Sequence, residues 1–108
     1  MNRAHLTPTL DALRVFGQQL AVARRAQRQT TAEVAERAGI SLPTLRKAER
    51  GDPGVSIGIM FDIATILGVP LFAATGRRLA ELAASGEREL ALLPSRIDRP
   101  RTDVDNDF

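Results

Sequence analysis

The sequence contains no cysteine, no tryptophan and no tyrosine, and only four of its 108 residues are phenylalanine. The absence of cysteine excludes disulfides, thiolate metal sites and cysteine nucleophiles. The single histidine, His5, lies near the amino terminus, and we assign it no role as a ligand or base. Asp103, Asp105 and Asp107 lie near the other end of the chain, away from any expected pocket. We therefore expect no enzyme activity, no metal and no cofactor.

The sequence also lacks a long apolar run. No stretch approaches the roughly 18 apolar residues of a membrane span, and no signal-peptide pattern opens the chain. We therefore expect a cytoplasmic protein without a membrane partner, and the absence of cysteine fits a reducing compartment. Because aromatic residues are few, a core of alanine, leucine, isoleucine and valine favours an all-α fold of packed helices. A chain of this length allows one modest domain and a tail.

The net charge is only +2, but it is unevenly distributed. Residues 24–51 carry seven basic and three acidic side chains, whereas residues 97–108 carry two arginines and four aspartates. A basic centre beside an acidic end favours an anionic partner for the centre. Fourteen of the fifteen basic residues are arginine. Arginine suits phosphates and guanine edges, although GC-rich codon usage also replaces lysine by arginine.

Thr7 and Pro8 form a helix-start signal, because threonine can cap free amides and proline fits the first helical position. Apolar residues then recur every three or four positions and predict a helix that runs to about Ala26. Gly17 is a point at which this helix could divide into a short lead-in and a main helix. The apolar face consists of Leu10, Leu13, Phe16 or Gly17, Leu20 and Ala23.

The central stretch, residues 29–51, predicts two short helices joined by a tight turn. Thr30 and Glu33 match a capping box at the start of the first helix. Gly39 supplies the left-handed residue that ends this helix, and Ser41 caps the next one. Two helices joined by so short a break must cross steeply, which is the geometry of a helix-turn-helix. The side chains expected to pack in the core are Val34, Ala35, Ala38, Ile40, Leu45 and Ala48.

The block after this motif predicts a supporting core. Ser56 caps a strongly amphipathic helix that ends at Gly68. Pro70 opens a further short turn of helix, in which we expect Leu71 and Phe72 to be buried. The apolar positions of the main helix are Ile57, Met60, Phe61, Ile63, Ala64 and Leu67.

Residues 77–93 keep helical apolar spacing straight through Ser85 and Gly86, which predicts one helix that Pro94 stops. The core does not need this helix. Its leucine stripe therefore either covers an edge of the core or forms a dimer seam with a second copy of the chain. The candidate seam residues are Leu79, Leu82, Leu90 and Leu93.

Residues 95–108 have too few apolar side chains to order themselves by burial. We expect either a disordered, acidic, solubilising tail or a segment that folds on a partner, anchored by Val104 and Phe108. The predicted organisation is a helix-turn-helix domain over 1–75, a carboxyl-terminal helix over 76–94 and a flexible tail over 95–108.

Residues 24–73 resemble the Cro/C1 (XRE) family of DNA-binding domains. The matching segments, whose spacing holds throughout, are Arg24-Arg25, Thr30–Ala35, Gly39–Gly51 and Leu67-Gly68-Val69. The resemblance implies a compact four- or five-helix, lambda-repressor-like domain that binds operator DNA, usually as a homodimer. It also implies an internal salt bridge between Arg24 or Arg25 and Glu49, as an alternative to a DNA contact by these arginines.

Two residues depart from the family pattern. Thr31 stands where the family commonly has a glutamine that touches a phosphate, so that contact is shortened or lost. Pro43 replaces a residue that is often polar and faces DNA, which narrows the set of side chains that can contact bases.

The whole layout is also similar to that of HipB-type antitoxins, the DNA-binding partners of HipA-like kinases. This similarity lies in the small size, the link Gly51–Ser56, the turn Leu67–Phe72 and the sequence Leu92-Leu93-Pro94 before an aspartate-rich end. It implies repression of the protein's own operon and neutralisation of a toxin by direct binding.

In such domains the second helix of the motif enters the major groove of DNA with its amino-terminal end. We expect Thr44 and Arg46 at base edges, where arginine can bond guanine at two points. Ser41 and Lys47 reach phosphates, with help from Arg28 and the amides at the start of the preceding helix. The full set of predicted DNA-binding residues is Arg28, Thr30, Thr31, Ser41, Leu42, Pro43, Thr44, Arg46, Lys47 and Arg50.

Two other functions remain open beside the antitoxin that represses its operon. One is a free-standing phage-type or metabolic repressor with no toxin partner. The other is a protein-interaction module, in which toxin binding is the main task and DNA binding is secondary. The interaction module predicts that the tail or the helix over residues 79–93 is sequestered by another chain. A kinase-like gene in the same operon would separate these two.

Overall fold

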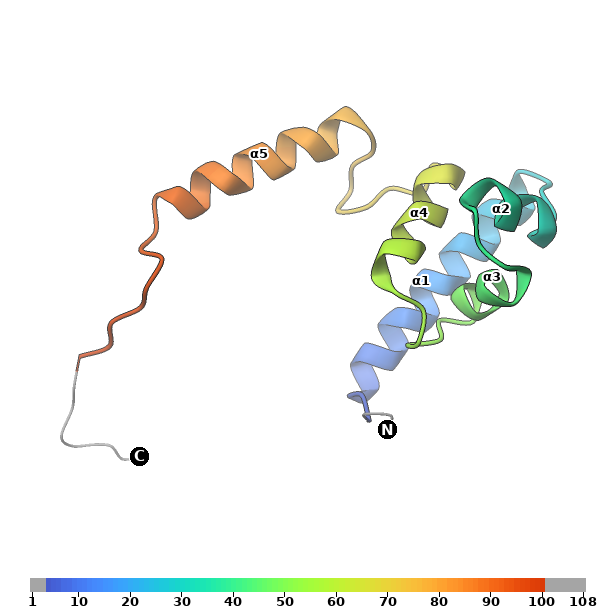
Figure 1. Cartoon of the computed structure of the whole chain (residues 1–108), viewed down its shortest axis with the longest axis horizontal. Helices are drawn as coiled ribbons and strands as arrows, with labels where there is room; N and C mark the ends of the chain where they lie inside the picture. The colour runs from blue at the N-terminus through green and yellow to red at the C-terminus, as the bar shows by residue number, and fades with distance from the viewer. Residues whose placement is uncertain (1–3, 101–108) are drawn as a thin grey trace. The chain divides into compact units, whose positions relative to one another are not determined.

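Five α-helices are present in residues 4–100, the part of the chain that the computed structural model describes (Figure 1). They are α1 (Thr7–Ala26), α2 (Thr31–Ala38), α3 (Leu42–Glu49), α4 (Ile57–Leu67) and α5 (Arg77–Ala91). The predicted all-α class is confirmed. The chain divides between Thr75 and Gly76 into an amino-terminal unit that holds the first four helices and a carboxyl-terminal unit that holds α5. Among the described residues, no helix is both long and apolar enough to cross a membrane.

The core of the amino-terminal unit forms where α1 and α2 each pack against both α3 and α4. Each helix contributes side chains that water does not reach. Burying a leucine or isoleucine side chain contributes about 1.5–3 kcal/mol, so this shared core holds the short α2 and α3 in place. The buried hydrophobic cluster consists of Leu20, Val34, Ala35, Leu45, Ala48, Met60, Ile63, Ala64 and Leu67.

Helix α1 follows the predicted span but begins differently. Leu6 is the residue that precedes its first turn, and no side chain caps this end, so the prediction that Thr7 is the cap was wrong. Thr7 is already helical, and Pro8 lies in the first turn, where no backbone amide is needed. The helix does not divide at Gly17.

Gly17 is buried because α1 and α3 approach each other closely at this point. A Cβ atom at Gly17 would lie 2.6 Å from the carbonyl oxygen of Glu49 and 2.7 Å from that of Ala48. A glycine is therefore required here for the backbone of α1 to contact the end of α3.

One apolar side chain of α4 lies outside the core. Ile57 is 68% exposed, so its predicted inward position was wrong. It is the first residue of α4, and helical spacing identifies the apolar face of a helix without showing how far the core extends along it.

The segment after Pro70 forms a tight turn rather than the predicted turn of helix. Leu71 and Ala74 pair through two backbone hydrogen bonds of 2.8 and 2.9 Å. The two residues between them, Phe72 and Ala73, have φ of +54° and +59°, as in a type I′ turn. This turn directs Phe72 outward, where it is 77% exposed, so its predicted burial was also wrong. The Phe72 ring still contacts the ring of Phe61, edge to face, at 6.2 Å between centroids.

The carboxyl-terminal unit contains α5, which runs without interruption through Ser85 and Gly86, as predicted. It ends at Ala91, so Leu93 lies beyond the helix rather than on its stripe as expected. Residues 95–100 form neither helix nor strand and are exposed. Val104 and Phe108 lie outside the described residues, and their expected role in partner binding stays a prediction.

Candidate nucleic-acid interface

A tight turn joins α2 to α3. Gly39 has φ of +68°, a left-handed conformation that glycine adopts without steric cost. Its amide bonds the carbonyl of Glu36 at 3.1 Å, and the amide of Ile40 bonds that of Ala35 at 3.0 Å. These bonds satisfy the last carbonyls of α2 and turn the chain. Ser41 then accepts a hydrogen bond from the Thr44 amide at 3.2 Å and starts α3 as predicted.

The start of α2 is held by the predicted capping box. The Thr30 hydroxyl accepts from the Glu33 amide at 3.0 Å, and the Glu33 carboxylate accepts from the Thr30 amide at 2.7 Å. Hydrogen bonds to the carboxylate from the backbone and the side chain of Thr30 lower the pKa of Glu33. The amide of Thr30 is therefore occupied within the chain. Thr31 and Ala32 are the first two residues of α2. No helical carbonyl lies one turn before them, so their amides have no acceptor within the helix.

Helix α3 has one buried face and one basic face. Leu45 and Ala48 are completely buried against the core. Positions separated by three, four and seven residues share a face of a helix, and one such set here is exposed. Within residues 4–100, neither Arg46 nor Lys47 of this set forms an ion pair. The exposed set is Pro43, Arg46, Lys47 and Arg50.

Two other predicted contact residues of α3 are less accessible. Leu42 and Thr44 are half-buried. The Thr44 hydroxyl lies 2.8 Å from that of Ser41, and either hydroxyl can be the donor. Since the Ser41 oxygen already accepts the amide of Thr44, one hydroxyl proton of this pair is free to reach a further acceptor.

A buried ion pair fixes α3 relative to α1. The Nε of Arg24 lies 2.6 Å from Oε2 of Glu49, and its Nη2 lies 3.0 Å from Oε1. The Arg24 Nη1 also donates to the carbonyl of Gln29 at 3.0 Å. The Glu49 carboxylate raises the pKa of Arg24 and outweighs the opposing effect of burial. Of the two arginines proposed for this role by the sequence, Arg24 is therefore the structural one, and Arg25 is exposed.

Arg28 lies in the turn between α1 and α2 and has φ of +58°. Its amide bonds the carbonyl of Arg25 at 3.0 Å, and the next amide, that of Gln29, bonds the carbonyl of Arg24 at 3.1 Å. Arg28 thus occupies the left-handed position after a helix, where glycine is the usual residue. Its side chain is exposed beside the start of α2.

Sequence reasoning missed two glutamines that hold this turn. The Gln27 side chain donates to the carbonyl of Leu67 at 2.6 Å, and that of Gln29 accepts from Arg37 at 2.6 Å. The bonds tie the turn to the end of α4 and to α2, and they position Arg28 and Thr30. Neither glutamine has a signal in apolar periodicity, since both interact through polar atoms.

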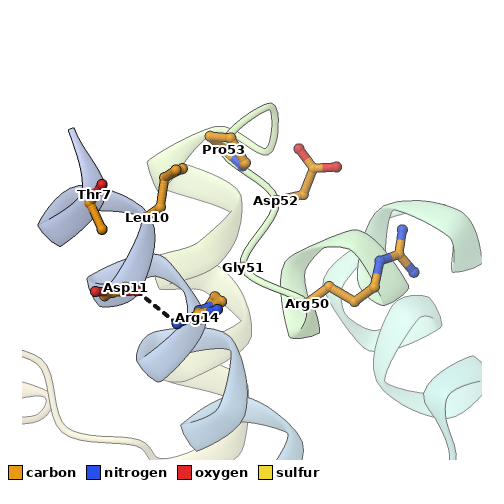
Figure 2. Close-up of a pocket in the computed structure, with 8 residues that line it drawn as sticks. All are labelled: Thr7, Leu10, Asp11, Arg14, Arg50, Gly51, Asp52 and Pro53. Atoms are coloured by element: carbon orange, nitrogen blue, oxygen red, sulfur yellow. Dashed lines mark hydrogen bonds and ion pairs between the residues drawn. The ribbon is translucent and has the colours of Figure 1, made fainter. Parts of the chain in front are cut away.

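A surface hollow of about 560 Å³ lies between the start of α1 and the turn after α3. Figure 2 shows Leu10 and Pro53 along it, with the Asp11–Arg14 ion pair at its edge at 2.7 Å. The Arg50 guanidinium points away from Leu10 in this view. Within residues 4–100, no group of three or more histidine, aspartate or glutamate residues is placed to hold a metal ion.

The candidate seam residues belong to the carboxyl-terminal unit. Leu79 and Leu82 on α5 are half-buried, whereas Leu90 is 70% exposed and Leu93, beyond the helix, is 59% exposed. No residue of α5 is buried, so its apolar stripe is accessible within its own unit.

Comparison with known proteins agrees with this geometry. Residues 15–74 match the family model of a helix-turn-helix domain, and this match covers more than half of the chain. No curated protein and no solved structure matches the chain. The chain therefore belongs to the helix-turn-helix domain family and, like the XRE proteins that its motif resembles, is a DNA-binding transcriptional regulator.

Proposed function

We propose that this regulator is a sequence-specific repressor that inserts α3 into the major groove of operator DNA. The observation that carries the proposal is the division of α3 into a fully buried face, with Leu45 and Ala48, and an exposed face with Arg46 and Lys47. The buried face holds the helix in place before DNA is present. Little further conformational entropy of its backbone is therefore lost when the exposed face binds DNA. Such a helix is suited to contact bases by its free side chains.

Each predicted contact residue on α3 and at its two caps has a proposed role. Arg46 bonds a guanine at two points, because a guanidinium matches the two acceptors of its major-groove edge. Thr44 contacts a base edge, while Leu42 and Pro43 supply apolar contact to thymine methyl groups. Lys47 binds phosphate, and the same role is proposed for Ser41 and Arg50.

The start of α2 is the second proposed contact region. The free amides of Thr31 and Ala32 lie at the positive end of the helix dipole and suit a phosphate. Arg28 supports this contact from the preceding turn. Thr30 has less to offer than predicted, because its amide is bonded to the Glu33 carboxylate.

We further propose that the protein acts as a homodimer. One α3 covers a single half-site, and two copies about 34 Å apart can contact successive major grooves and combine their binding energies. The candidate seam is the leucine face of α5, and the division of the chain into units 1–75, 76–94 and 95–108 follows from these roles.

The most specific function that we propose is that of an antitoxin, which represses its own operon and neutralises a HipA-like kinase. Its support is the similarity of layout to HipB-type antitoxins. A free-standing repressor would have the same α3 and no toxin partner, and an interaction module would use α5 or the tail mainly for a partner chain.

The first test is selection of binding sites from a pool of random DNA duplexes. We expect enrichment of a sequence with two symmetric half-sites about one helical turn apart. Binding of the pool without enrichment would contradict sequence-specific recognition and leave only electrostatic attraction.

The second test separates the antitoxin from the other two functions. The full-length chain and a chain that ends at Pro94 are each expressed from the native operon and recovered with bound proteins. A kinase-sized partner that is recovered only with the full-length chain supports the antitoxin and places its partner-binding segment after residue 94. Recovery of operator DNA without any protein partner from both chains would contradict it.

A further inference from the structure

Helix α5 carries an apolar stripe that its own unit does not cover. The residues at the centre of the stripe follow one another at intervals of four, three and four positions. This spacing places them on one face of the helix. All residues of α5 are described, and none is buried. A lone helix of about 15 residues is marginal in water, so α5 needs a partner surface for its stability. The centre of the stripe consists of Leu79, Ala83, Gly86 and Leu90, and Leu82 lies at its edge.

The charges beside the stripe indicate which orientation a second α5 would take. At about 100° per residue, Arg78 and Glu89 lie about 20° apart on one flank, near opposite ends of the helix. Glu87 lies on the other flank. In an antiparallel pair the same flanks meet, so Arg78 of each copy lies near Glu89 of the other. The existing pair of Arg78 with Glu81, at 3.2 Å, is exposed and does not prevent this.

A parallel pair would bring opposite flanks together. Glu87 of one helix would then lie at nearly the same height as Glu89 of the other, and like charges would repel. The antiparallel arrangement also places Leu79 opposite Leu90 and Ala83 opposite Gly86. The small residues at the centre allow the two backbones to approach closely, and the large residues close both ends.

We propose that the apolar face of α5 binds the same face of a second copy of this chain in antiparallel orientation. This inference adds the interface and the orientation to the homodimer proposed above. It rests on the proposed function only for its expected effect on DNA binding. A helix of 15 residues is about 22 Å long, so antiparallel pairing separates the two α5 starts by about this length. Parallel pairing would place them about 10 Å apart. The wider separation suits two DNA-binding units that contact half-sites about 34 Å apart.

A seam of one short helix per chain is smaller than a standard interface of about 1,600 Å². We therefore expect a dimer whose formation depends on protein concentration and which DNA with two half-sites stabilises.

Because the chain contains no cysteine, single introduced thiols report the orientation directly. Full-length Leu79→Cys chains and size-tagged Leu90→Cys chains are treated with a short bis-maleimide, separately and as a mixture. The antiparallel seam predicts cross-linked dimers in the mixture and little in either chain alone. A parallel seam would cross-link each chain alone, which overturns the proposal. Ala84→Cys lies on the far side of the helix from the stripe and serves as the control that should not cross-link.

A second pair of variants keeps the proposal testable if cross-linking is inefficient. Leu90→Glu places a charge on the stripe, and the matched Ala84→Glu places the same charge outside it, four residues before Arg88. We expect Leu90→Glu to be monomeric by light scattering at concentrations where Ala84→Glu is dimeric. It should bind the selected two-half-site duplex at least tenfold more weakly and a single half-site with unchanged affinity.

The two proposals fail in different ways. If the full-length chain is monomeric at every concentration, or if hydrogen exchange shows α5 protected in a monomer, the antiparallel seam is wrong even when DNA binding is intact. If the Leu79→Cys and Leu90→Cys chains cross-link as predicted but no duplex is enriched in selection, the seam stands and the proposed repressor function is wrong.

Discussion

The carboxylate of Glu49, at the last residue of α3, receives two hydrogen bonds from the guanidinium of Arg24 on α1, at 2.6 and 3.0 Å. Both side chains are about nine-tenths buried, and Arg24 also donates to the carbonyl of Gln29. The pair therefore fixes three parts of the DNA-binding unit relative to one another: α1, the end of the proposed recognition helix and the turn that leads to α2.

Removal of one partner of this pair leaves a buried, unpaired charge. We expect Glu49→Ala to lower the free energy of unfolding by about 3–5 kcal/mol. The double change Arg24→Met with Glu49→Met should cost much less, because both charges are removed and apolar contacts replace them. Urea unfolding measures both. The exposed Asp11–Arg14 pair is the control, and Arg14→Ala should change stability by less than about 1 kcal/mol. Equal costs for Glu49→Ala and Arg14→Ala would contradict the account.

Gly17 tests the close approach of α1 to α3. In Gly17→Ala the new Cβ meets the carbonyl oxygens of Glu49 and Ala48 at 2.6 and 2.7 Å, so the helices must separate. We expect a loss of about 1–3 kcal/mol in the free energy of unfolding and weaker DNA binding. Gly58→Ala in α4 has no heavy atom within 4 Å of its new Cβ and should instead stabilise by up to about 1 kcal/mol. A stable Gly17→Ala with unchanged DNA affinity would show that the packing is looser than described.

Arg28 combines a strained backbone with a proposed phosphate contact. A left-handed non-glycine residue costs about 1–2 kcal/mol. Arg28→Gly should therefore raise the free energy of unfolding while it weakens binding to all duplexes, whereas Arg28→Ala keeps the strain and loses the contact. Thermal unfolding and fluorescence anisotropy measure the two effects. If Arg28→Gly binds DNA as tightly as the unaltered chain, Arg28 has no role at the interface.

Glu33 gives the capping box a pH dependence. Hydrogen bonds from Thr30 hold the pKa of the Glu33 carboxyl below its usual value. Its stabilising effect is therefore complete above the pKa of the unfolded chain and is lost as the pH falls through the lower folded pKa. NMR titration of the carboxyl carbon should give a pKa below that of an unstructured peptide. Glu33→Gln keeps the hydrogen bonds and should remove this local pH dependence. A normal pKa for Glu33 would indicate that the box is open in solution.

The sequence was sufficient to predict the ends of the central helices. Capping is local chemistry, so Thr30 with Glu33, Gly39 and Ser41 each act at the predicted end. The burial of Leu45 and Ala48 followed from helical spacing, and the same spacing indicated that Arg46 faces away from the core.

Features that depend on tertiary contacts could not be predicted in this way. Ile57 has the spacing of a core residue but lies beyond the end of the core. Phe72 and Ala73 adopt two consecutive left-handed conformations that neither residue type favours, so no local signal indicated the turn. Gly17 resembled a helix break because its packing partner lies on another helix.

The proposed interface shows the same division. The exposed face of α3 was predictable because the cap and the buried residues of the helix fix its rotation. The left-handed backbone of Arg28 and the bond of Gln27 to the carbonyl of Leu67 were not, because they depend on how the end of α1 meets the end of α4.

The proposed role of Arg46 is the central claim, and the most direct test measures Arg46→Ala against the selected duplex and its single-base variants. Loss of a two-point guanine contact should cost about 1–3 kcal/mol and abolish the preference at one position of each half-site. Lys47→Ala should weaken binding to all sequences equally and reduce the salt dependence by about one ion, and Arg14→Ala is the charge-matched control from the same unit. If Arg46→Ala weakens every duplex equally and keeps the preference at every position, Arg46 is a phosphate contact and the proposed readout is wrong.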